Sequence, residues 1–493
     1  MSARCFLHVL TLGFFSALAC AAERPLNVLL ITADDMNADS PGWMGNPLKL
    51  TPTLDRFAAT AHRFVNQHVS APICQPSRSA LMTGRVPHRS GALGFNPVKE
   101  GTPTLVTVLQ AAGYFTAGIN KLPHMMPESC FPWDVRLAGS GKNPDLIGRQ
   151  TRDAISASQR AGKPFFINCN ITDPHRPFYG ARQTPAQKKK AARREDDGTN
   201  GDDPTESEGV VVPVTPAEVP IPSFLEDVPE LRREVAQYYS SIKRLDLSFA
   251  AVMKALDESG EAVRTCVVFM SDHGMSFPFS KATVYFNGTR SPVLLRWPGM
   301  GATQTREEMV SSVDLMPTLL ELMHVAAPSG IDGRSWLPLL RGETQPDRDH
   351  VFTHVNSVSS GIWFPQRCVR TLNRALMFHA WAGPTASFRV EAMSGLSYNA
   401  LASAAKSDAR IQARVDQLLH GTTLAFYDLT RDQDERRNEI DNPAYATEVA
   451  RMKQQMLGYM ERTNDPQLEY YRRALAGKPV NFQMERVPKK KGE

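Results

Sequence analysis

The sequence predicts an α/β protein: a large mixed, mostly parallel β-sheet sandwiched by helices, followed by a smaller C-terminal α+β subdomain. Short apolar runs rich in β-branched residues recur along the N-terminal part, and stretches with helical apolar periodicity separate them. Buried strands that alternate with helices are typical of a parallel sheet covered on both faces. From about residue 346 this alternation gives way to several strands in succession and a closing helix.

The strands expected in the large sheet are 26–33, 115–119, 164–171, 264–270 and 291–297. The helices expected between them are 54–65, 105–113 and the long amphipathic stretch 235–260. The C-terminal part is expected to hold strands at 350–356, 368–372 and 374–381, a strand and turn at 426–440, and a helix at 443–463. The predicted domains are therefore 23–345 and 346–493.

Residues 1–22 are typical of a secretory signal peptide. Arg4 precedes the apolar run 6–19, and small residues follow that run. We expect cleavage near Ala21 or Ala22, with lipid attachment at Cys20 as the alternative. No later segment is long and apolar enough to suggest a spanning helix. The mature protein is therefore expected to be secreted or periplasmic, without stable membrane insertion.

Residues 181–222 interrupt the globular pattern. Blocks of opposite charge, together with Gly, Ser and Pro, indicate an exposed insertion. The net charge of +5 over 493 residues is modest, so we expect no nucleic-acid partner.

The cysteines are too few for a disulfide-stapled scaffold: the chain has seven, and five remain after the signal peptide. Cys169 and Cys266 lie in predicted strands and are expected to be small apolar fillers. The sequence leaves open a disulfide between Cys130 and Cys368. The core must therefore be held together mainly by burial of apolar side chains.

Acidic and imidazole groups follow three of the predicted strands. Asp34 and Asp35 follow the first strand, His175 follows the strand 164–171, and Asp272 and His273 follow the strand 264–270. Each group taken alone is compatible with a turn or a helix cap. Because parallel strands end at one edge of a sheet, the three groups together predict a site there.

Three converging carboxylates require a cation, since their mutual repulsion would otherwise protonate one of them. Oxygen ligands favour calcium, whereas zinc would normally require more His or Cys. The predicted metal ligands include Asp34, Asp35, Asp272 and His273. Cationic or proton-carrying groups are expected around them: Arg78, Lys121, His124, His175 and Lys281. Such a set describes a site for a tetrahedral oxyanion.

The stretch ICQPSRSALMTGR, residues 73–85, places a cysteine at the start of a predicted helix. Pro76 favours a turn at Cys74, and Ser77 is the expected N-cap. Cys74 would then face the positive end of the helix, with Arg78 one turn further on. The alternative is a buried structural cysteine beside a helix cap.

This stretch resembles the type I sulfatase signature, Cys-x-Pro-Ser-Arg followed by Thr-Gly-Arg. Further segments are similar to that family in the same order: NVLLITADD, GYFTAGINKLPH, TDPHRPF and FMSDHG, and later IDGRSWLPLL and FYDLTRDQDERRNEI. The resemblance implies an alkaline-phosphatase-like fold and hydrolysis of sulfate esters or sulfamates. It also implies that Cys74 is oxidised before folding to Cα-formylglycine, which requires a formylglycine-generating enzyme as a partner.

The resemblance assigns roles to individual residues. It implies that modified Cys74 joins Asp34, Asp35, Asp272 and His273 in binding calcium. Arg78 would hold the formylglycine hydrate. Lys121 and His124 would contact the hydrate or the sulfate, and His175 and Lys281 the sulfate and its leaving atom. The family usually has one residue between the lysine and the histidine of the Lys121 segment, whereas this chain has two.

Details such as TDPHRPF and WFPQRCVRT resemble the sulfamidase subgroup, whose members remove N-linked sulfate from glucosamine in heparan sulfate. The expected substrate is thus a sulfated saccharide. An O-sulfatase acting on another sulfated glycan is the alternative. A phosphodiesterase or phosphonate hydrolase of the same superfamily would usually have Thr or Ser at the nucleophile position, and a non-catalytic glycan-binding protein would be expected to lack a ligand or the cysteine.

Overall fold

A computed structural model describes residues 25–181 and 210–483 of the chain. Within these residues, eight strands form one sheet in the order β5-β4-β6-β1-β7-β8-β2-β9. Their bounds are β1 Asn27–Asp34, β2 His62–Phe64, β4 Phe115–Ile119, β5 Val135–Leu137, β6 Phe165–Pro174, β7 Thr265–Ser271, β8 Val293–Arg296 and β9 Thr305–Arg306. The strands from β5 to β7 are parallel, whereas β8 pairs antiparallel with β7 and with β2. The predicted fold class is confirmed.

The central strand β1 lies between β6 and β7, and all eight of its residues are buried. Its side chains alternate between two hydrophobic clusters. Leu29 and Ile31 belong to one cluster, and Val28 and Leu30 to the other. A strand covered on both faces must be apolar throughout, which explains the unbroken apolar run in the sequence.

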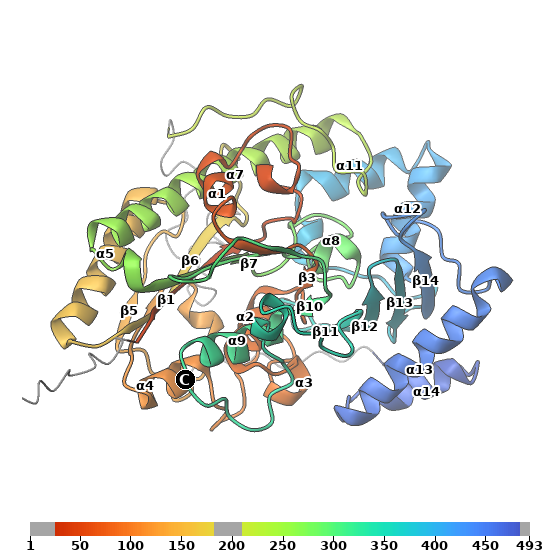
Figure 1. Cartoon of the computed structure of the whole chain (residues 1–493). Coiled ribbons are helices and arrows are strands. Elements are labelled where there is room, and N and C mark those ends of the chain that lie inside the picture. Colours follow the sequence, from red (N-terminus) through yellow and green to blue (C-terminus); the bar gives the residue numbers. More distant parts are fainter. Residues whose placement is uncertain (1–24, 182–209, 484–493) are drawn as a thin grey trace, which may run out of the picture.

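Helices cover both faces of this sheet (Figure 1). One layer contains α1 (Pro52–Ala58), α5 (Pro144–Ala161) and α7 (Pro229–Glu258), and the other contains α2 (Cys74–Thr83), α4 (Leu105–Ala111) and α9 (Leu315–Leu322). Helix α5 shows why such segments fold locally. Its N-cap Asn143 accepts a hydrogen bond from the backbone N–H of Leu146, Pro144 occupies the first turn, and Gly162 ends the helix at φ 66°.

The predicted helix 54–65 is wrong in its second half. Helix α1 ends at Ala58, and His62–Phe64 form the short strand β2. This strand bonds to β8 on one side and to β9 on the other, so sheet pairing that is distant in the chain overrides the local helical pattern. Shorter elements complete the described N-terminal part: β3 (Gln67–His68), α3 (Pro87–Ser90), α8 (Phe286–Thr289), β10 (Val310–Ser311) and α10 (Leu337–Leu340).

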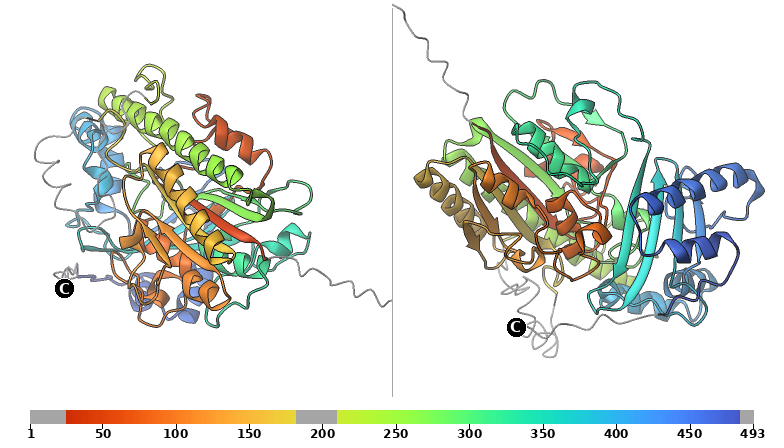
Figure 2. Two further views of the ribbon diagram at one scale, coloured as in Figure 1. Left: turned by 90° about the vertical axis from the view of Figure 1, so that its left-hand side faces the viewer. Right: turned by 90° about the horizontal axis from the view of Figure 1, so that it is seen from below.

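The C-terminal part contains an antiparallel sheet of β11 (His350–Ser357), β12 (Trp363–Thr371), β13 (Arg374–His379) and β14 (Leu424–Asp428). Helices α13 (Ala446–Arg462) and α14 (Leu468–Leu475) pack on its outer face, as the right-hand view of Figure 2 shows. The opposite face contributes Cys368, Met377 and Tyr427 to the same cluster as Leu29 of β1. The sequence did not predict α11 (Leu396–Ala404) and α12 (Ala409–His420), which lie between β13 and β14. The predicted division at residue 345 stays a prediction.

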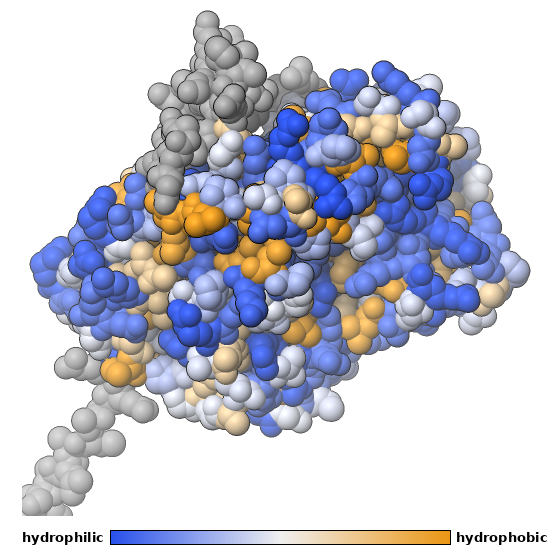
Figure 3. Space-filling view, turned by 90° about the horizontal axis from the view of Figure 1, so that it is seen from above, coloured by the Kyte–Doolittle hydropathy of each residue, from blue (hydrophilic) through white to orange (hydrophobic). Residues whose placement is uncertain are grey.

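The predicted signal peptide 1–22 and most of the insertion 181–222 lie outside the described residues. The described part contains no helix with the length and hydropathy required to cross a bilayer. The face in Figure 3 is mainly hydrophilic, with apolar residues in small groups. All five cysteines of the described part are buried and free. The disulfide between Cys130 and Cys368 that the sequence left open is therefore not formed. The two residues belong to different hydrophobic clusters, Cys130 to the cluster of Val28 and Leu30 and Cys368 to the cluster of Leu29 and Ile31.

Buried histidines lie where the C-terminal sheet meets the helix layer of the large sheet. His88 of α3 lies 5.4 Å, ring to ring, from His354 of β11, and 3.9 Å from a carboxylate oxygen of Asp465. Arg367 of β12 binds both oxygens of Asp465, at 2.6 and 2.7 Å. Burial lowers the pKa of His88 to about 4, against the attraction of Asp465, and burial also lowers the pKa of His354 well below its usual range.

We expect the free energy of unfolding to fall as the pH drops from about 6.5 to 4. An unfolded histidine takes up a proton near pH 6.5, whereas His88 in the folded protein resists protonation down to about pH 4. The stabilising contribution of the neutral His88 is therefore complete above pH 6.5 and is lost toward pH 4, and it amounts to roughly 3 kcal/mol. Urea unfolding at several pH values checks this. His88→Asn should flatten the pH dependence, whereas His324→Asn, at an exposed position, should not. Equal slopes in wild type and His88→Asn would contradict the prediction.

Candidate active site

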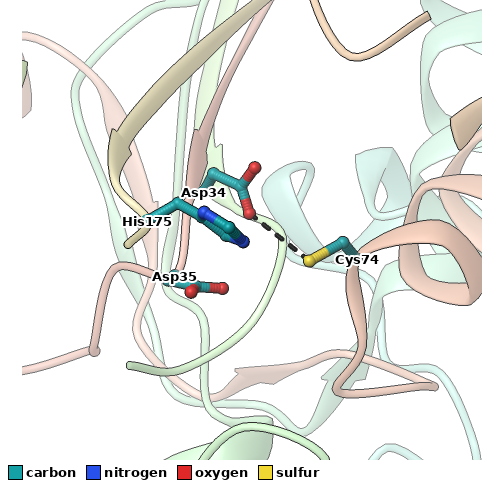
Figure 4. Close-up of side chains that lie close together, drawn as sticks. All are labelled: Asp34, Asp35, Cys74 and His175. Atoms are coloured by element: carbon teal, nitrogen blue, oxygen red, sulfur yellow. Dashed lines mark hydrogen bonds between the residues drawn. The ribbon is translucent and has the colours of Figure 1, made fainter. Parts of the chain in front are cut away.

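The predicted site residues meet at the edge of the large sheet where the parallel strands end. β1 ends at Asp34, β6 is followed directly by His175, and β7 is followed by Asp272 and His273. Lys121 follows β4, and Cys74 begins helix α2, which approaches from the side (Figure 4). Parallel strands deliver their carboxyl ends to one edge, so residues from distant segments converge there.

Cys74 lies at the centre of this group. Its sulfur is 3.5 Å from Oδ1 of Asp34 and 3.3 Å from Nε2 of His273. In Figure 4 the side chains of Asp34, Asp35 and His175 point toward it. Burial raises the pKa of the Cys74 thiol well above its usual range. Lys281 lowers that pKa, but the neighbouring carboxylates raise it further. The unmodified side chain is therefore a neutral thiol and a poor nucleophile.

The start of α2 differs from the prediction. Ile73 is the extended N-cap and Cys74 is the first helical residue, so Ser77 lies within the helix and is not its cap. Pro76 is tolerated because an N–H in the first turn has no partner within the helix. The Ser77 hydroxyl instead donates to the backbone carbonyl of Asp272 at 2.6 Å. This bond ties the cysteine-bearing helix to the end of β7.

Arg78 is buried one turn after Cys74, as predicted. Its guanidinium donates to Oδ2 of Asp272 at 3.0 Å, to the hydroxyl of Thr32 at 2.9 Å, and to the side-chain carbonyl of Asn170. Thr32 of β1 and Asn170 of β6 were missed by the sequence prediction. The available signal was the pair of asparagines, Asn168 and Asn170, in the otherwise apolar run FFINCNI. Thr32 and Asn170 accept hydrogen bonds from Arg78 and so fix the orientation of its buried guanidinium group.

Two cations lie against the first pair of carboxylates. Lys121 Nζ is 2.6 Å from Oδ2 of Asp34, and Lys281 Nζ is 3.0 Å from Oδ2 of Asp35. Asp35 and Lys121 both adopt a left-handed backbone, with φ 67° and 53°. Such conformations are uncommon outside glycine and cluster at functional sites.

His124 is buried beside this group without a direct bond to it. Its ring packs edge-on against Phe95, and neither ring nitrogen has a hydrogen-bond partner among the described residues. Burial, with Lys121 and Arg78, holds its pKa well below the usual range. It is therefore a neutral imidazole with free nitrogen atoms at the rim of the cluster.

His175 has its orientation fixed by its own loop. Nδ1 lies 2.6 Å from the carbonyl oxygen of Arg176, an acceptor, so Nδ1 carries the proton and Nε2 faces the site. Burial, together with Lys281 and Lys121, lowers the pKa of His175 well below its usual range. Glu391, which the sequence prediction missed, lies 3.5 Å from Nε2 of His175 and 3.4 Å from Nζ of Lys281. Nothing in the irregular segment around Glu391 signalled this position.

The donor set fits a hard divalent cation. One candidate ligand atom each from Asp34, Cys74, Asp272 and His273 lies within 4.8 Å of the others, and Asp34, Asp35, Cys74 and His175 form a second such group. Oδ1 of Asp35 is buried without a hydrogen-bond partner in the described part of the chain. Burial raises the pKa of Asp35 to about 6 against the pull of Lys281, which a bound cation would reverse.

The comparisons with known proteins agree with this site. The family model described as Sulfatase matches residues 26–325. Human N-sulphoglucosamine sulphohydrolase is 27% identical, with 94% of each chain covered, and human arylsulfatase A is 27% identical over 68% of this chain and 72% of its own. A structure solved with D-glucosamine-2-N,6-O-disulfate has a similar fold, with TM-score 0.65 and 19% identity over 94% of this chain and all of that one (100%). The chain belongs to the sulfatase family, and its relatives identify it as a hydrolase of sulfate esters or sulfamates.

Proposed function

We propose that this chain is a secreted or periplasmic sulfatase that removes N-linked sulfate from glucosamine in heparan sulfate or heparin. The observation that supports this substrate is the similarity to human N-sulphoglucosamine sulphohydrolase, which extends over 94% of both chains and so includes the C-terminal part. Arylsulfatase A, at the same identity, covers only 68% of this chain. Substrate choice depends on pocket loops, so a match over the whole length favours the sulfamidase activity.

In this proposal Cys74 is converted to formylglycine by a formylglycine-generating enzyme. The hydrated aldehyde supplies two hydroxyl groups on one carbon, one to accept the SO₃ group and one to expel it as sulfate. The burial and high pKa of the Cys74 thiol support the need for this modification. Arg78, held by Asp272, Thr32 and Asn170, orients the modified side chain.

Asp34, Asp35, Asp272 and His273 would hold calcium together with modified Cys74. The ion would supply fixed positive charge that stabilises negative charge on the sulfate oxygens. The inner cluster contains three carboxylates and three permanent cations, Arg78, Lys121 and Lys281, and therefore sums to zero. A divalent cation changes that sum to +2, which suits an anionic substrate.

The remaining residues act on the substrate. Lys121 and His124 contact the sulfate or the hydrate, and Lys281 binds the sulfate near its leaving atom. Nε2 of His175 faces the site, because Nδ1 is bound to the carbonyl of Arg176. We assign His175 as the general acid that delivers a proton to the leaving nitrogen. Burial keeps the ring neutral in the free protein, and Glu391 beside Nε2 together with the anionic substrate favours the protonated ring that this role requires.

The test is a comparison of defined saccharides with the protein co-produced with a formylglycine-generating enzyme. We expect sulfate release from N-sulfoglucosamine with a kcat/KM at least about tenfold above that for glucosamine 6-O-sulfate. Mass analysis of the tryptic peptide containing Cys74 should show the aldehyde. Release of 6-O-sulfate alone would identify the alternative O-sulfatase, and hydrolysis of a phosphonate monoester alone would contradict both.

A further inference from the structure

Glu391 brings a negative charge from the C-terminal part of the chain to the site residues described above, which all come from the N-terminal part. It begins a short helical turn, Glu391–Met393, between β13 and α11. Its Oε1 lies 3.5 Å from Nε2 of His175, and its Oε2 lies 3.4 Å from Nζ of Lys281. Its side chain is 19% exposed. It is therefore the carboxylate placed at the mouth of the cluster, beside the two groups assigned to the leaving side.

We propose that Glu391 determines specificity by binding the nitrogen atom of the N-sulfated glucosamine, an inference that rests on the proposed function. The sulfate group is anionic, so a carboxylate cannot lie against its oxygens. It can lie beside the leaving atom, which must come within hydrogen-bonding reach of Nε2 of His175 for proton transfer. Glu391 lies next to Nε2 of His175 and is therefore also close to the expected position of the leaving atom.

The leaving atom of a sulfamate can donate a hydrogen bond to a carboxylate, whereas the leaving atom of a sulfate ester cannot. The sulfamate nitrogen carries a hydrogen and donates it to Glu391, whereas the bridging oxygen of an ester has no hydrogen and presents lone pairs to the carboxylate. An acceptor aimed at an acceptor is unfavourable in a buried site. The same charge thus attracts N-sulfate and repels O-sulfate at this position.

The product strengthens this distinction. When the S–N bond breaks, the nitrogen keeps the electron pair of that bond and receives one proton from His175, which leaves a neutral amine. The amine of glucosamine then takes a second proton from solvent at neutral pH and becomes an ammonium ion. An alcohol product stays neutral. Glu391 therefore forms a charge-assisted hydrogen bond with the first product and not with the second.

The segment that carries Glu391 is tied to the loop of His175. Arg176, the residue after His175, pairs with Glu234 of α7. Glu234 in turn accepts hydrogen bonds from the backbone N–H groups of Leu396, at 3.0 Å, and Ser397, at 2.7 Å. A Cβ at Gly395 would meet the ends of the Glu234 and Arg176 side chains, so a larger residue there would require this ion pair to shift. The segment that follows Glu391 and the loop that carries His175 are thus linked through the pair of Arg176 and Glu234.

Two measurements test Glu391→Gln against wild type. The first is the ratio of kcat/KM for N-sulfoglucosamine to that for 4-methylumbelliferyl sulfate, which we expect to fall at least about thirtyfold. The second is binding of the product to the Cys74→Ala protein. Adding Glu391→Gln should weaken glucosamine binding at least about tenfold, while N-acetylglucosamine, which cannot become an ammonium ion, should show no such loss.

Glu308→Gln is the matched control, because Glu308 is a partly exposed glutamate paired with Arg306 far from the site. Glu391→Asp keeps the charge and should give intermediate glucosamine affinity, which separates the loss of charge from misfolding. Equal losses on both substrates, or unchanged glucosamine binding, would overturn the inference. A wild-type protein that releases no N-sulfate would refute the proposed function, and the glucosamine measurement would still decide the role of Glu391.

Discussion

Cys74→Ser is expected to abolish steady-state hydrolysis of every sulfated substrate. A serine at the start of α2 would present one hydroxyl group to the same carboxylates and cations, and could accept one SO₃ group. It lacks the second hydroxyl on the same carbon that expels sulfate, so the protein should stall as a sulfated species. Rapid-quench assays should show at most one sulfate transferred per molecule, and intact-mass measurement should show the added group.

Cys130→Ser is the control for this substitution. Cys130 is also a buried free cysteine, but it packs in a hydrophobic cluster, and its thiol donates to the backbone carbonyl of Lys99 at 3.6 Å. Its replacement should reduce stability while turnover continues. Sustained turnover by Cys74→Ser would refute the proposed role of this position.

Asp272→Asn is expected to lower kcat/KM by about three orders of magnitude or more, together with calcium affinity. Asp272 accepts hydrogen bonds from the backbone N–H of Asp35, at 3.1 Å, and from Arg78, at 3.0 Å. An amide removes one negative charge from the predicted metal site and leaves the buried Arg78 with less compensation. Calcium titration followed by thermal unfolding measures the affinity, and sulfate release measures the activity.

Asp314→Asn is the matched control, because Asp314 is a buried carboxylate that also pairs with an arginine, Arg348. It should lower the melting temperature without changing the calcium-induced stabilisation. If Asp272→Asn bound calcium like wild type, the assignment of the metal ligands would be wrong.

The sequence predicted the parts of the site that depend on sheet topology. Asp34, His175 and Asp272 each follow an apolar strand, and the convergence of parallel strand ends brings them together whatever lies between them in the chain. Cys74 and Arg78 were predicted from a short motif, and their proximity follows from one turn of helix. These are local signals combined with one general rule of sheet geometry.

The residues that the sequence did not reveal depend on contacts between distant segments. Asn170 was hidden in a buried strand, and its role appears only when Arg78 is packed against it. Glu391 lies in an irregular segment with no periodicity, more than 200 residues from His175. The strand β2 was predicted as helix because its pairing with β8 and β9 leaves no local pattern. Tertiary packing decides each of these cases.

The side chain of Cys74 is 2% exposed in the folded chain, and the helix that carries it is fastened to β7 through Ser77. An enzyme that oxidises this thiol needs the surrounding peptide in an accessible, extended form, which the native fold denies. Oxidation of Cys74 would then compete with folding, because a chain that folds first buries the unmodified thiol. Overproduced protein should accordingly be a mixture of active and inactive molecules, in a proportion set by the supply of the maturation enzyme.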